Sequence, residues 1–116
     1  MIDDEPLLGR TLGFMLEENH DVVVAASGAD GLQQLARDDA FDLVLCDLDM
    51  PGVNGGEVHE TMRTKHPHLM SRFVLMSGGA CTLWAEEFIA RYSGQQLEKP
   101  FTAADVERVL QALFYQ

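Results

Sequence analysis

Residues 42–51 read DLVLCDLDMP, and this stretch decides the fold. Its first half is mostly apolar and, together with Phe41, predicts a strand over residues 41–46. Its second half carries the acids Asp47 and Asp49 and then Pro51, which is typical of a loop. The sequence therefore predicts a strand that is followed directly by a carboxylate.

Similar short apolar runs alternate with amphipathic segments along the chain, which is typical of βαβ units around a parallel sheet. Further strands are predicted at residues 22–26 and 72–76, and a less apolar one, typical of a sheet edge, at 95–98. Apolar residues at helical spacing predict helices at residues 6–19, 29–38, 56–66, 82–92 and 103–115. The fold class is α/β.

The length and composition favour one folded domain over residues 1–116. Hydrophobic residues make up 47% of the 116 residues and charged residues 23%, which is ordinary for a globular domain. The net charge of −11 would repel a phosphate backbone, and the eight Lys and Arg residues form no basic run. We therefore expect no direct contact with nucleic acid.

The cysteines and the apolar stretches bear on the cellular location. Cys46 and Cys81 belong to no spaced metal motif and are expected to be reduced thiols. The apolar runs are only a few residues long, far short of a membrane span. These features predict a cytoplasmic protein without direct membrane contact.

The start of the chain is unusual for this architecture, because a βα unit needs a strand before its first helix. Only Met1 and Ile2 precede the first acids. We expect the first strand to be truncated and the natural chain to extend upstream of Met1.

Five polar side chains lie at the ends of predicted strands. Because the carboxyl ends of parallel strands meet at one edge of a sheet, these residues are expected to converge: Asp3, Asp4, Asp47, Ser77 and Lys99. Three neighbouring carboxylates need a compensating cation, and their hard oxygen atoms favour Mg²⁺. An amine and a hydroxyl beside them suit the oxygens of a phosphoryl group, so the pattern predicts a carboxylate nucleophile.

At this point the sequence resembles the receiver domains of response regulators in two-component signalling, over essentially its whole length. The matching segments are IDDEP at 2–6, DLVLCDLDMP at 42–51 with Gly55, VLMSG at 74–78 and KPF at 99–101. The resemblance implies a flavodoxin-like, doubly wound (βα)5 fold with strand order 2-1-3-4-5.

The resemblance also implies a role for each polar residue. Asp47 would accept the phosphoryl group, Ser77 would hydrogen-bond it, and Lys99, before a cis peptide bond to Pro100, would pair with it. The ligands of Mg²⁺ would be Asp4 and Asp47 directly, Asp3 mainly through water, and the backbone carbonyl of Asp49.

The partners follow from the same resemblance. The donor would be a histidine kinase or a histidine phosphotransfer domain, docked on Leu7, Leu8 and Thr11 beside Asp47. A dimer through the face formed by the fourth and fifth helices is a further expectation. Trp84, near the start of the fourth helix, is interpreted as a partner anchor, with a place in the core as the alternative.

One departure concerns the output of the domain. Receivers usually carry an aromatic residue three positions before the lysine, and Gln96 stands there in this chain. The domain would then signal differently or mainly relay phosphoryl groups. The domain could be a stand-alone regulator, or it could be the receiver of a hybrid sensor histidine kinase and so part of an enzyme. The residues around Ser77 and Lys99 resemble those in receivers of hybrid kinases.

Competing interpretations remain. The triplet Asp47-Leu48-Asp49 resembles the nucleophile motif of haloacid-dehalogenase-type phosphatases, and a receiver-like interaction module that is never phosphorylated is a second alternative. Taken alone, Asp3 and Asp4 would be a charge pair at a helix N-terminus. The four histidines are scattered and do not favour zinc.

Overall fold

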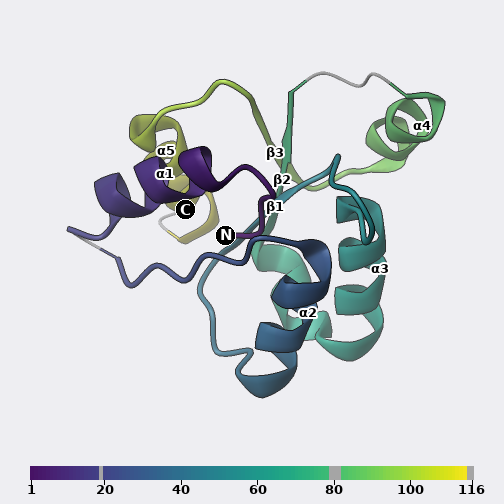
Figure 1. Cartoon of the computed structure of the whole chain (residues 1–116), viewed down its shortest axis with the longest axis horizontal. Helices are drawn as coiled ribbons and strands as arrows, with labels where there is room; N and C mark the ends of the chain where they lie inside the picture. The colour runs from purple at the N-terminus through teal and green to yellow at the C-terminus, as the bar shows by residue number, and fades with distance from the viewer. Residues whose placement is uncertain (19, 79–81, 115–116) are drawn as a thin grey trace.

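The computed structural model describes residues 1–18, 20–78 and 82–114 (Figure 1). Three parallel strands form a sheet in the order β1 (Val44–Asp47), β2 (Phe73–Ser77) and β3 (Gln95–Glu98). The helices are α1 (Pro6–Leu16), α2 (Gly28–Arg37), α3 (Gly55–Lys65), α4 (Leu83–Arg91) and α5 (Ala103–Phe114), with a short 3₁₀ helix η1 (Pro67–Arg72) before β2. This is the predicted α/β class.

Two isolated bridges extend the sheet beyond β1. Ile2 pairs in parallel with Cys46 of β1 on one side and with Ala25 on the other. The spatial order is therefore Ala25, Ile2, β1, β2, β3. It corresponds to the predicted order 2-1-3-4-5, with the first two positions held by single bridges.

The strand predicted at residues 22–26 is wrong in extent, because only Ala25 bridges. Its N–H donates to the Met1 carbonyl at 2.8 Å, and its carbonyl accepts from Asp3 N–H at 3.0 Å. The Met1 amine donates to the Val23 carbonyl at 2.8 Å. Because the chain before α1 is short, it offers backbone hydrogen-bond partners only to the residues around Ala25. Val22 and Val23 instead line a groove of about 570 Å³.

Other boundaries move by a few residues. Asp47 and Ser77 are the last residues of β1 and β2 instead of following them, since Asp47 pairs with Met76 and Ser77 with Glu98. Helix α1 ends at Leu16, earlier than predicted. Asn19 and Tyr115, where two predicted helices end, lie outside the described residues.

Strands β1 and β2 are buried on both faces, and their side chains alternate between two clusters, whereas only Leu97 of β3 is buried. Phe73 and Leu75 face one side of the sheet, whereas Val74 and Met76 face the other. The first cluster is covered by α2, α3 and α4, and the second by α1 and α5 (Figure 1). Two apolar layers therefore fix the register of β2 and the residue at its carboxyl end.

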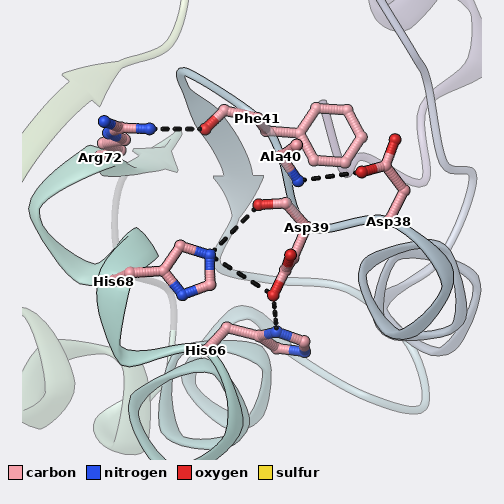
Figure 2. A network of polar contacts seen from close by, with 7 residues as sticks. All are labelled: Asp38, Asp39, Ala40, Phe41, His66, His68 and Arg72. Carbon is pink, nitrogen blue, oxygen red and sulfur yellow. Dashed lines mark hydrogen bonds and ion pairs between the residues drawn. The ribbon is translucent and has the colours of Figure 1, made fainter.

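The loop after α2 is fastened to η1 by a small polar network (Figure 2). Asp39 Oδ2 lies 3.0 Å from His66 Nδ1 and 3.4 Å from His68 Nε2. Arg72 donates to the Phe41 carbonyl at 3.2 Å. The network lies beside the amino end of β1, at the opposite end of the strand from Asp47.

Among the described residues, no helix has the length and apolar character needed to cross a membrane.

Gly55, the first residue of α3, lies against the backbone at the end of β1. Among the described residues, the glycine with positive φ is Gly52, at 74°. At Gly55 a Cβ atom would lie 2.3 Å from the Asp47 carbonyl oxygen and 2.6 Å from Leu48 Cα. The backbone at the start of α3 therefore approaches the end of β1 too closely for any side chain.

We expect Gly55→Ala to destabilise the protein by about 2 kcal/mol, because the clash is with backbone atoms that cannot swing aside. The neighbouring Gly56→Ala is the control, since its Cβ would meet side-chain atoms at 3.2 Å or more. Urea unfolding measures both. Equal stability of the two variants would contradict the close-approach role.

Candidate functional site

The carboxyl edge of the sheet gathers the predicted polar residues. Asp47 ends β1, Ser77 ends β2 and Lys99 follows β3. The Lys99 N–H donates to the Ser77 carbonyl at 2.7 Å, which continues the pairing of β2 with β3 by one residue. The strand register thus places the hydroxyl residue beside the lysine.

Asp3 is the most completely held acid of the site. Its residue is 1% exposed, and both carboxylate oxygens have partners. Oδ1 accepts from the Glu5 N–H at 2.8 Å, and Oδ2 accepts from Lys99 Nζ at 3.0 Å. These two donors satisfy the buried carboxylate of Asp3.

Lys99 links the acids of the site. Its amine lies 3.4 Å from Asp47 Oδ2, in addition to its contact with Asp3, and the Lys99-Pro100 peptide bond is cis, as expected. Burial disfavours the charged amine, but the hydrogen bond to Asp3 and the charges of Asp47, Asp3 and Glu5 outweigh it. Together they raise the pKa of Lys99 above its ordinary value, so the amine stays charged.

Asp47 carries a shifted pKa. Burial raises the pKa of Asp47 to about 6, with Asp3 and Asp4 adding to the shift and Lys99 opposing it. The residue is only 4% exposed. One lysine therefore does not compensate the acids fully, and the site favours a further cation.

The donor set fits a hard divalent ion. Asp3, Asp4 and Asp47 each offer a carboxylate oxygen within 4.8 Å of the others, and Asp4 is partly exposed. Oxygen ligands from two or three carboxylates, with one side open to water, suit Mg²⁺. These are the acids that the sequence predicted as its ligands.

The remaining predicted residues lie around this centre. Ser77 is partly exposed, and Asp49 is exposed on the loop after β1. On α1, Leu7 is 78% exposed and Thr11 is exposed, with its hydroxyl donating to the Leu7 carbonyl at 2.8 Å. Leu8 is half-buried and packs against the second apolar cluster, so it is less available to a partner than expected.

One residue beside Lys99 and one exposed residue of α1 were not predicted. Glu5 Oε1 lies 3.8 Å from Lys99 Nζ, and its place directly after the acidic pair was the available signal. Phe14 is 80% exposed on α1, seven residues after Leu7, and helical spacing could have revealed it.

The expected output region is only partly described. Gln96 is exposed on β3, and Trp84 is 38% exposed at the start of α4. Residues 79–81, including Cys81, lie outside the described residues. Cys46 is a buried free thiol, as expected.

Comparisons with known proteins agree with this geometry. Residues 1–111 match the model of the response regulator receiver domain. The response regulator protein FleR of Pseudomonas aeruginosa is 33% identical over 104 residues, covering 89% of this chain and 21% of FleR. The nitrate/nitrite response regulator NarL of Escherichia coli is 35% identical over 79 residues, covering 66% of this chain and 36% of NarL. The chain thus spans a minor part of these relatives.

Solved structures show the same fold. The receiver domain from Clostridium thermocellum superposes with a TM-score of 0.81 at 25% identity, covering 98% of this chain and 90% of that one. The chemotaxis protein CheY4 of Vibrio cholerae gives 0.81 at 21% identity, covering 97% and 94%.

The shifted pKa of Asp47 has a consequence for stability without divalent cations. Because the folded-state pKa of about 6 exceeds that of the unfolded chain, protonation of Asp47 favours folding. This gain is full below about pH 4 and is lost as the pH rises through about 6. We expect Asp47→Asn to stabilise the protein by about 1 to 2 kcal/mol at about pH 8 and by far less at about pH 4.5.

Chemical denaturation in EDTA at both pH values measures this difference. Asp49→Asn is the control, since that residue is exposed. If the stability gained in Asp47→Asn does not grow with pH, the raised pKa of Asp47 would be contradicted.

Proposed function

The chain belongs to the response regulator receiver family of two-component signalling, and we propose that residues 1–116 act as one receiver domain that accepts a phosphoryl group on Asp47. One observation carries the proposal. A charged lysine lies 3.4 Å from a buried aspartate at a sheet edge where two further carboxylates gather. A nucleophilic carboxylate and an amine for the incoming phosphoryl oxygens are thereby within reach of each other.

The chain's own residues mainly position the reactants and stabilise charge. An Asp47 oxygen attacks phosphorus in line with the departing group, and the backbone contact of Asp47 N–H with the Ile2 carbonyl at 2.9 Å holds that residue. Lys99 then exchanges its contact with Asp47 for one with the transferred phosphoryl oxygens. The Ser77 hydroxyl donates to the same group.

The proposal includes Mg²⁺ held by Asp4 and Asp47, by Asp3 through water, and by the carbonyl of Asp49. When bound, Mg²⁺ offsets the negative charge of the carboxylates and of the phosphoryl oxygens. The fit of the three carboxylates to such an ion supports this part.

Receiver domains take phosphoryl groups from histidine kinases or histidine phosphotransfer proteins, and we propose that such a donor docks on α1. Leu7, Thr11 and Phe14 lie exposed along one helical stripe that starts two residues after Glu5. Because the stripe begins two residues after Glu5, whose carboxylate lies 3.8 Å from the Lys99 amine, it would seat a helical partner close to the site.

After phosphorylation, movement of Ser77 toward the phosphoryl group would shift the loop that follows β2 and then α4. With Gln96 in place of the usual aromatic residue, the domain would either signal by a different route or mainly relay phosphoryl groups. The proposal also includes a cytoplasmic location and a dimer through the face formed by α4 and α5. The parent protein would be either a stand-alone regulator or a hybrid histidine kinase.

Acetyl phosphate with Mg²⁺ tests the phosphoacceptor role. We expect the intact mass to rise by one phosphoryl group, because the small donor needs only the site itself. Asp47→Asn should remain unmodified, and EDTA should abolish the gain. Labelling that persists in Asp47→Asn would contradict the assignment, and absence of labelling in the wild type would favour an unphosphorylated module.

The same preparation separates a receiver from a phosphatase. A receiver should take up one phosphoryl group per molecule and lose it slowly. Continuous turnover of a generic phosphate ester would instead indicate a haloacid-dehalogenase-type enzyme.

Donor docking is tested on α1 with a histidine kinase that phosphorylates the wild type. We expect Leu7→Asp and Phe14→Asp to slow transfer from the kinase by tenfold or more. Each places a charge in an apolar contact that would contribute about 1.5 kcal/mol or more to the binding free energy of the kinase. Acetyl phosphate labelling should be unchanged.

Leu8→Asp is a poorer probe, since Leu8 packs partly against the core. Glu18→Gln, an exposed change beyond the end of α1, is the control. Equal losses with the kinase and with acetyl phosphate would remove the docking role.

A further inference from the structure

Lys99 has three carboxylate neighbours, and they do not play the same part. Its amine lies 3.0 Å from Asp3, 3.4 Å from Asp47 and 3.8 Å from Glu5. Asp3 and Asp47 are buried and belong to the group of acids that fits a metal, whereas the Glu5 side chain is 65% exposed and lies outside that group. Glu5 therefore contacts the lysine from the solvent side.

The Glu5 side chain has no evident structural task. Glu5 is the N-cap residue of α1, yet its side chain makes no capping hydrogen bond. Glu5 contacts Asp3 through its backbone N–H and not through its side chain. Its carboxylate is among the groups that raise the pKa of Lys99. The negative charge acts on the lysine and on whatever approaches it.

We propose that Glu5 is a positioning residue that contacts Lys99 from the solvent side and repels anionic phosphodonors, so that it slows phosphorylation of Asp47 by small dianions. This inference rests on the proposed function. In the reaction with acetyl phosphate, the bond from phosphorus to the acetate oxygen breaks and a bond to an Asp47 oxygen forms. Acetate leaves with the electron pair, and no proton is needed.

Two electrostatic effects act in the same direction. A dianion that reaches Lys99 must displace the Glu5 carboxylate from the amine. It must also approach a fixed negative charge at the mouth of the site, where exposure to water and salt weakens the repulsion but does not remove it. A protein donor that brings its own positive groups would be affected less, so Glu5 would favour the cognate partner over small metabolites.

The test compares initial rates of acetyl phosphate labelling by intact mass at saturating Mg²⁺. We expect Glu5→Gln to react about threefold faster than the wild type at low ionic strength, and Glu5→Lys faster still. Glu5→Asp, which keeps the charge, should stay near the wild-type rate. Raising the ionic strength from about 0.02 M to about 0.5 M should shrink the difference between wild type and Glu5→Gln.

Glu17→Gln is the matched control, because it changes the net charge equally but lies at the far end of α1, about 18 Å along the helix. Its rate should equal that of the wild type. Equal rates for wild type and Glu5→Gln, a slower Glu5→Gln, or an equal gain in Glu17→Gln would each overturn the role of Glu5. A wild type that takes up no phosphoryl group would instead overturn the proposed function, and the inference with it.

Discussion

The ion pair between Lys99 and Asp3 is the interaction on which the site depends. Asp3 is almost fully buried, and its two oxygens are satisfied by a backbone N–H and by the lysine amine, 3.0 Å away. An unpaired buried carboxylate would be costly, so the lysine cannot leave without replacement. The same amine lies 3.4 Å from Asp47 Oδ2, so the lysine is a counter-charge for Asp3 and also a positive charge beside Asp47.

The fold brings these groups together through strand register. Alternate side chains of β1 and β2 enter opposite apolar layers, so a slip by one residue would move each side chain into the opposite layer and disrupt the packing of both. This constraint fixes Asp47 and Ser77 at the last positions of their strands. The close approach of Gly55 to the Asp47 carbonyl holds the loop that follows. The polar groups of the site then lie together at the carboxyl edge of the sheet, and they belong to neither apolar cluster.

Much of this could be predicted from sequence, because strand ends and polar residues coincide. The α/β class, the edge position of β3 and the convergence of Asp3, Asp4, Asp47 and Lys99 follow from residue pattern and sheet geometry. The strand at 22–26 could not be predicted correctly, because its local pattern is strand-like while pairing depends on the residues beside it. The contact of Glu5 with Lys99 depends on how the chain turns into α1, and spacing does not encode that.

The central claim is that Asp47, and no neighbouring acid, carries the phosphoryl group. Borohydride reduction of the protein after reaction with acetyl phosphate and Mg²⁺ marks the modified residue, because it converts an aspartyl phosphate to homoserine. Peptide mass spectrometry then locates the change. The account requires homoserine at position 47 alone. Homoserine at Asp3, Asp4 or Asp49, with Asp47 unchanged, would contradict it.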